Sequence, residues 1–361
     1  MSSNGSLLDQ LGIEHPIIQA PMAGVSTPEM AAAVSNAGGL GSIGVGAEDA
    51  RGARKMIDAT RALTVRPFNV NVFCHEPATA RPDVEAAWIA RLRPELTRLG
   101  AEPPAALREI YTSFRDDDDM VALFVETKPG VVSCHFGLPR EDQIAALRGA
   151  GITLLASATS LREARIVVDA GIAAVIAQGY EAGGHRGVFD PDAADDQIGT
   201  LALTRLIARS FATPVIAAGG IMDGAGIAAA LRLGAAAAQL GTAFVACPES
   251  SADVGYRAAL AGDAAHHTVM TRAISGRPAR CLANRFTAIG KAIADAEIPA
   301  YPIAYDLGKA LHTAGKRKSE YGFGAQWAGQ GAPLCRPMMP AAELLRTLID
   351  ELRWARHIKN G

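Results

Sequence analysis

The sequence predicts an α/β protein, a (β/α)8 TIM barrel with a small helical cap domain inserted after strand eight. Eight short apolar runs alternate along the chain with segments of helical spacing. Runs that are apolar on both faces are typical of parallel strands covered by helices, and eight such units close a barrel. An open, doubly wound sheet is the alternative. The runs are PIIQAP (16–21), GLGSIGV (39–45), FNVNVF (68–73), VVSCHF (131–136), TLLASAT (153–159), AAVIAQG (173–179), PVIAAGG (214–220) and AAAAQLGT (235–242).

The segments between these runs carry the start and stop signals of helices. Ser26 or Thr27 is placed to cap a helix whose first turn contains Pro28, and proline is favoured there because its missing N–H needs no partner. TSLREARIVVDAG and MDGAGIAAALRLG likewise open on polar residues and end at a glycine, which is common just beyond a helix. These signals predict a helix after each strand.

Two stretches interrupt the regular alternation. Residues 74–130 separate the third run from the fourth and include the helical pattern DVEAAWIARLRPELTRLG. Residues 251–329 follow the eighth run and carry further helices, so we expect them to form a cap beside the barrel mouth. AAELLRTLIDELRWARH then supplies an amphipathic closing helix. The predicted barrel therefore comprises residues 1–250 and 330–361, with the cap at residues 251–329.

Composition and charge exclude several classes of protein. The 361 residues are 49% hydrophobic and 20% charged, as in globular domains, and the formal net charge of −2 gives no reason to bind nucleic acid or an anionic membrane. The first residues lack the pattern of a signal peptide, and no apolar run is long enough to span a bilayer. The five cysteines show no metal-ligand spacing. We expect a cytoplasmic protein without a metal site.

Two glycine-containing loops are candidates for a phosphate site. Ala218-Gly219-Gly220 ends the seventh run, and Gln239 to Thr242 ends the eighth. The loops after strands seven and eight of such barrels commonly bind phosphate through backbone N–H groups. The alternative is that these glycines only turn the chain. GLGSIG (39–44) matches a dinucleotide fingerprint, but it lies inside a strand and follows a helix, so we set that match aside.

Other polar side chains are expected at the same end of the barrel. Asn69 and Asn71 alternate within one run, so both point to one face, and whichever lies near the mouth could hydrogen-bond the edge of a planar cofactor, as could Gln178. Buried amides with purely structural partners are the alternative. His185 lies in QGYEAGGHRG, directly after the sixth run. That loop is either a tight turn or a ligand mouth with a proton acceptor.

A family resemblance decides between some of these alternatives. The segments IIQAPMAGVSTPEMAAAVSNAGGLGSIG, FNVNVFCH, VVSCHFG, AQGYEAGGHRG, AAGGIMDG and QLGTAFVACPES closely resemble the nitronate monooxygenases, formerly called 2-nitropropane dioxygenases, which are FMN-dependent barrels. The likeness covers nearly the whole chain and includes YPIAYDLGKAL and GAQWAGQGAP. This combination is similar to the class I group, whose favoured substrate is propionate 3-nitronate.

The resemblance implies roles for particular residues. His185 matches the catalytic histidine of the family. The implied substrate-binding residues are Tyr111, His135, Tyr301, Tyr305 and Lys309. The implied FMN contacts are Met22, Asn71, Gln178, Gly183, Gly220, Gln239, Leu240, Gly241 and Thr242.

The resemblance also implies a reaction. A nitronate and O2 would be converted to a carbonyl compound, malonate semialdehyde for propionate 3-nitronate, plus nitrite or nitrate. His185 would either remove a proton from a nitroalkane or, when protonated, hold the anionic nitronate.

Rival functions are an NAD(P)H:quinone reductase or an enoyl-acyl-carrier-protein reductase of the same flavin barrel group, and a barrel that only binds a phosphorylated ligand. A homodimer is compatible with the sequence, which does not fix the oligomeric state.

Overall fold

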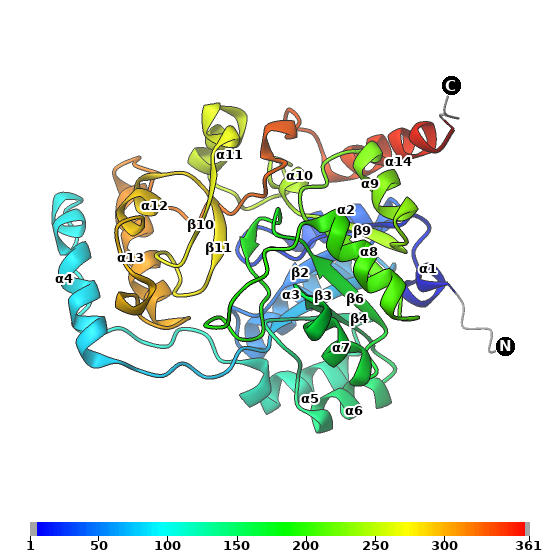
Figure 1. Ribbon diagram of the computed structural model, residues 1–361, viewed down its shortest axis with the longest axis horizontal. Helices are drawn as coiled ribbons and strands as arrows, with labels where there is room; N and C mark the ends of the chain where they lie inside the picture. The colour runs from blue at the N-terminus through cyan, green and yellow to red at the C-terminus, as the bar shows by residue number, and fades with distance from the viewer. Residues whose placement is uncertain (1–5, 358–361) are drawn as a thin grey trace.

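The centre of the molecule is a closed eight-stranded parallel barrel (Figure 1). The structure, a computed structural model, describes residues 6–357. A parallel bridge between Ile18 and Leu40 joins the first strand to the second and closes the sheet, whose order is β1-β9-β8-β6-β5-β4-β3-β2. The predicted barrel is confirmed, because each of the eight apolar runs contains one strand. The strands are β1 (Ile17–Gln19), β2 (Gly41–Gly44), β3 (Phe68–Phe73), β4 (Val131–His135), β5 (Thr153–Ala158), β6 (Ala174–Gln178), β8 (Val215–Ala218) and β9 (Ala237–Leu240).

Helices follow the barrel strands as the cap signals predict. Thr27, rather than Ser26, is the N-cap of α2, where its Oγ1 accepts from the Met30 N–H at 3.1 Å and Pro28 begins the helix. Such a cap is worth about 1 kcal/mol to helix stability. The helices are α1 (Leu7–Leu11), α2 (Pro28–Asn36), α3 (Ala50–Leu63), α4 (Pro82–Arg98), α5 (Asp118–Thr127), α6 (Glu141–Gly149), α7 (Leu161–Asp169), α8 (Thr200–Ser210), α9 (Gly224–Arg232), α10 (Thr242–Val245), α11 (Val254–Ala261), α12 (Arg285–Gly290), α13 (Ile303–Arg317) and α14 (Ala341–His357).

The segment after the eighth barrel strand contains a sheet that the sequence analysis did not anticipate. Strands β10 (Thr268–Thr271) and β11 (Ala279–Leu282) pair antiparallel. The third strand of this sheet is β7 (Gly184–His185), which belongs to the loop after β6. His185 pairs with Ala279 in that sheet. The barrel loop that carries the predicted catalytic histidine is therefore tied directly to the cap.

Helix α4 comes from the long connection between β3 and β4, yet it packs against α13 (Figure 1). Trp88 and Leu92 of α4 share one apolar cluster with Leu307 and Leu311 of α13. Burying such side chains stabilises the contact by about 1.5–3 kcal/mol each. The predicted cap range 251–329 is thus joined by a helix that lies far from it in sequence. No helix within residues 6–357 combines the length and apolar character that a membrane crossing requires.

Candidate active site

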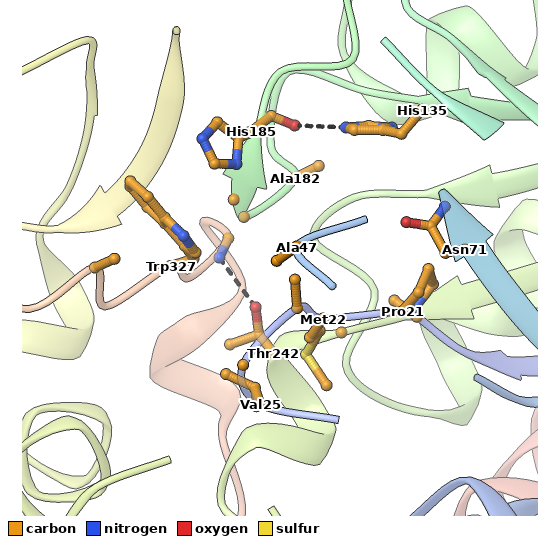
Figure 2. Close-up of a pocket in the computed structure, with 18 of the residues that line it drawn as sticks. Pro21, Met22, Val25, Ala47, Asn71, His135, Ala182, His185, Thr242 and Trp327 are labelled. Atoms are coloured by element: carbon orange, nitrogen blue, oxygen red, sulfur yellow. Dashed lines mark hydrogen bonds between the residues drawn. The ribbon is translucent and has the colours of Figure 1, made fainter. Parts of the chain in front are cut away.

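A cavity of about 470 Å³ lies at the carboxyl ends of the barrel strands, between the barrel and the cap (Figure 2). Its volume falls within the range of small-molecule and cofactor sites. Leu240 is the one predicted site residue that does not line it, because its side chain is buried in the core between β9 and the surrounding helices. The predicted residues that line the cavity are Met22, Asn71, Tyr111, His135, Gln178, Gly183, His185, Gly220, Gln239, Gly241, Thr242, Tyr301, Tyr305 and Lys309.

One end of the cavity has the features of a phosphate cradle. Gly219 and Gly220 have φ angles of +131° and +69°, and a Cβ at Gly219 would lie 2.5 Å from Thr200 Oγ1. Within residues 6–357, the backbone N–H groups of Gly219, Gly220 and Gly241 donate to no acceptor. The buried Gln239 Oε1 also lacks a donor in this part of the chain. The free N–H donors around an open cavity fit a phosphate group, and the Gln239 oxygen could accept from a donor elsewhere on the same ligand.

A glycine-rich segment, residues 327–331, packs next to these glycine loops and is hydrogen-bonded to one of them. The Gly329 N–H donates to Thr242 Oγ1 at 3.0 Å (Figure 2). A Cβ on Gly183 would lie 2.4 Å from the Gly329 nitrogen. Gly183 therefore has a packing reason for being glycine, in addition to its place in the cavity wall.

Asn71 and Gln178, the two amides predicted to contact a cofactor, differ in the hydrogen-bonding groups that remain free for a ligand. Asn71 Nδ2 donates to Ser133 O and Oγ, both at 3.0 Å, whereas its Oδ1 has no hydrogen-bond partner within residues 6–357. Gln178 is bonded at both ends to its own loop: Nε2 donates to His185 O at 2.9 Å, and Oε1 accepts from the Gly187 N–H at 2.7 Å. Asn71 therefore retains an acceptor for a ligand, and Gln178 holds the loop in place.

His135 lines the cavity with both ring nitrogens already bonded to the protein. Nε2 lies 3.2 Å from the carbonyl oxygen of His185 (Figure 2), and Nδ1 lies 2.7 Å from Ser157 Oγ. Because a carbonyl only accepts, Nε2 carries the proton and Nδ1 accepts from Ser157. Burial, followed by the charge of Arg277, lowers the pKa of His135 to about 4. The neutral ring of His135 thus supports the backbone of His185.

His185 stands in the cavity wall, surrounded by aromatic rings. Its ring centroid lies 5.1 Å from that of Trp327 and 5.4 Å from that of Tyr301. Burial lowers the pKa of His185 to about 3, with smaller contributions from His135 and Arg277. The imidazole is therefore neutral at ordinary pH. Of the two roles left open by the sequence, this state favours a proton acceptor over a cation that holds an anion.

A cation and hydroxyl groups line the cavity near His185. Tyr305 and Lys309 lie one turn apart on α13, and Tyr301 precedes that helix. Lys309 Nζ lies 4.8 Å from the ring centroid of Tyr111 and 5.6 Å from that of Tyr305. The Tyr301 hydroxyl is buried and has no hydrogen-bond partner within residues 6–357. These groups together can receive an anionic ligand.

Trp327 is a cavity residue that the reasoning from residues missed, although it lies in GAQWAGQGAP, one of the segments that carry the resemblance. Its ring approaches both His185 and Tyr305.

The described cysteines are free, and no group of three or more His, Cys, Asp or Glu in residues 6–357 is arranged to hold a metal ion.

The ring of His75 packs edge-on against that of Tyr301, with the ring centroids 5.0 Å apart. Its burial gives the stability of the folded protein a testable pH dependence. Its side chain is fully buried, and neither ring nitrogen has a hydrogen-bond partner in the described chain. Burial, followed by the charge of Arg277, lowers its pKa to about 4. The unfolded chain has a histidine pKa near 6.5, so between these values the unfolded state binds the extra proton. His75 therefore removes stability as pH falls through that window.

We expect His75→Phe to weaken this pH dependence. Between about pH 4 and 6.5, the slope of the unfolding free energy against pH should be smaller in the variant. The reduction should be at most the contribution of one proton, about 1.4 kcal/mol per pH unit. Urea unfolding at a series of pH values measures this slope. An unchanged slope would show that His75 does not titrate between the two states.

The comparisons with known proteins agree with this geometry. The family model "Nitronate monooxygenase" matches residues 4–351. A nitronate monooxygenase of Paraburkholderia phytofirmans is 64% identical over 96% of this chain and 95% of its own, and one of Pseudomonas aeruginosa is 55% identical over 95% and 97%. A crystal structure of nitroalkane oxidase from Streptomyces ansochromogenes has a TM-score of 0.88 at 42% identity, covering 98% of this chain and 99% of that one. The chain therefore belongs to the nitronate monooxygenase family.

Proposed function

We propose that the protein is an FMN-dependent enzyme that oxidises alkyl nitronates with O2 and favours propionate 3-nitronate. The products would be malonate semialdehyde and nitrite or nitrate. Family membership implies an oxidoreductase with a flavin cofactor. The observation that carries the finer proposal is that Lys309, the tyrosine hydroxyls and a neutral His185 line the same cavity as the glycine cradle.

The residues of the cavity fit FMN at both of its ends. The N–H groups of Gly219, Gly220 and Gly241 would hold the phosphate, and Gln239 Oε1 would accept a hydrogen bond from a cofactor group beside it. Asn71 Oδ1 would accept from the edge of the ring system. When bound, FMN supplies the electron transfer between the nitronate and O2. The chain itself binds and orients the reactants and limits the access of water.

The opposite wall would hold the substrate. Propionate 3-nitronate has two anionic ends, and Lys309 offers a compact positive charge to one of them. Tyr301 has an unpaired buried hydroxyl that can donate to the other. The pKa of Tyr305 is raised to about 12 by burial, so its hydroxyl also keeps its proton. The pairing of one cation with neutral donors is what favours a small dianion over an uncharged nitroalkane.

We expect Lys309→Met to raise KM for propionate 3-nitronate by about tenfold and to change kcat less, because the lost charge binds substrate and transition state alike. The KM of a singly charged nitronate without a carboxylate should rise less. Steady-state oxygen uptake with both substrates measures the difference. Equal rises for the two substrates would place the carboxylate elsewhere.

Anaerobic mixing separates this function from the reductases. The holoenzyme under nitrogen should lose its flavin absorbance when propionate 3-nitronate is added and keep it when NADH or NADPH is added. Rapid bleaching by the nicotinamide, without bleaching by the nitronate, would favour the reductase and overturn the proposal.

A further inference from the structure

The turn Ser275-Gly276-Arg277, between β10 and β11, reaches from the cap to the ring of His185. Ser275 Oγ lies 2.9 Å from His185 Nε2. We propose that Ser275 is a positioning residue that fixes the proton of neutral His185 on Nε2 and so leaves Nδ1 as the hydrogen-bond acceptor of this ring. Its effect on turnover rests on the proposed function, whereas the position of the proton does not.

The hydrogen bonds around Ser275 determine which way the proton points. Oγ also lies 3.3 Å from the Arg277 carbonyl oxygen and 3.4 Å from the Arg277 N–H, which can only donate. The serine hydroxyl has a single hydrogen and must give it either to that carbonyl or to His185. Within residues 6–357 the Arg277 carbonyl has no other donor. Giving the hydrogen to the carbonyl satisfies every group, and His185 Nε2–H then donates to Oγ.

The other ring nitrogen is left for a ligand. His185 Nδ1 has no hydrogen-bond partner in the described part of the chain, and it is not among the buried polar atoms without partners. Since His185 lines the cavity, Nδ1 retains contact with open space. With the proton on Nε2, this nitrogen presents a lone pair, which can take a proton from a neutral nitroalkane but cannot donate to a nitronate oxygen.

The turn that carries Ser275 is held rigidly. Ser275 is fully buried, and Gly276 adopts a φ of +91°. A Cβ at Gly276 would lie 2.5 Å from Pro299 O and 2.6 Å from the Tyr301 nitrogen, so the turn packs directly on the segment that leads to Tyr301. The Arg277 guanidinium stacks over Phe136, 4.3 Å from the ring centroid, and donates to Phe189 O at 3.3 Å. The serine therefore meets His185 in one fixed geometry.

The surroundings also keep the resting ring of His185 neutral, so that Nδ1 is unprotonated before a substrate binds. Arg277 is 3% exposed and forms no ion pair with a carboxylate in the described chain. Its unpaired charge disfavours a nearby imidazolium. The titratable groups that face His185 are the cationic Arg277 and the neutral side chains of His75, His135, Tyr301 and Tyr305. None of them is negatively charged, so the free ring stays neutral, and the imidazolium formed on proton transfer would be paired with the nitronate anion produced by the same step.

Nitrogen-15 NMR of the histidine rings in the holoenzyme tests the proposal directly. The His185 signals are identified by their loss in His185→Asn. We expect wild type to show a protonated Nε2 and an unprotonated Nδ1, Ser275→Ala to show a mixture of the two tautomers, and Ser275→Thr to restore the wild-type pattern. The matched control is Ser113→Ala, because Ser113 is also buried and its Oγ accepts from the N–H of the residue two positions later at 3.4 Å, but it bonds no histidine.

Each outcome decides the question. A wild-type ring protonated on Nδ1 or on both nitrogens would overturn the proposal, as would an unchanged tautomer in Ser275→Ala. In kinetic terms, Ser275→Ala should lower kcat for α-proton abstraction from a nitroalkane by about tenfold, with little change in KM and recovery in Ser275→Thr. If the expected tautomer is found but no nitronate is consumed, the proposed function fails and the role of Ser275 stands.

Discussion

His185→Asn should lower the rate of α-proton abstraction from a neutral nitroalkane by about 10²–10⁴-fold, and should lower nitronate turnover much less. The reason is that the His185 ring is neutral at ordinary pH and presents an unprotonated nitrogen to the cavity. A nitronate has already lost the proton, so it needs no base. Asparagine keeps a similar size and some hydrogen bonding while it removes the basic nitrogen.

The measurement compares 3-nitropropionate with propionate 3-nitronate on the same enzyme preparations. Release of the α-proton is followed by exchange of the substrate hydrogen with deuterium, which reports abstraction even if later steps are slow. Equal losses on both substrates would mean that His185 binds the anion instead. A wild-type enzyme that leaves the nitroalkane proton in place would contradict the base role outright.

Arg186→Met should destabilise the folded protein by about 3 kcal/mol, at the lower end of the cost of breaking a buried ion pair from one side, because the Asp195 side chain is 23% exposed. Arg186 is 2% exposed and forms a bidentate pair with Asp195, at 2.7 and 3.0 Å. It also donates to the carbonyl oxygens of Gln178 and Thr159. Methionine fills the space but removes the donors to both carbonyls and, in the described chain, leaves the Asp195 carboxylate with only the Gln197 N–H, at 2.9 Å.

Urea unfolding of the variant and of wild type measures this loss, and Arg54→Met is the matched control. Arg54 also forms an ion pair, with Glu126, but both side chains are well exposed. Such pairs contribute little because water screens them. We therefore expect Arg54→Met to unfold at the same urea concentration as wild type. Equal behaviour of the two variants would mean that the Arg186 network does not secure the loop after β6.

The barrel was predictable from the sequence because its signals are local. Each strand is a short run that is apolar on both faces, and features such as Thr27 followed by Pro28 mark where a helix begins. The position of the two glycine-containing loops at the cavity was predictable for a related reason. Once the strands are counted, the fold itself fixes which loops lie at the mouth.

The groups that the sequence did not reveal depend on contacts between distant segments. Helix α4 packs on α13, although the two helices lie more than two hundred residues apart in the sequence. Nothing in the apolar pattern of either helix indicates which helix it packs against. Ser275 meets His185 through a cap sheet that the apolar pattern did not show. His135 was expected to bind substrate by resemblance, yet its ring nitrogens are bonded to Ser157 and to the His185 carbonyl. Spacing alone does not show which hydrogen bonds are already made.

Oxygen uptake by the purified holoenzyme with propionate 3-nitronate shows whether the protein oxidises nitronates. The protein should carry the absorbance of oxidised FMN, consume O2 when the nitronate is added, and release nitrite or nitrate together with malonate semialdehyde. A preparation without flavin, or one whose flavin neither bleaches with the nitronate under nitrogen nor supports oxygen uptake in air, would rule out the proposed nitronate oxidation.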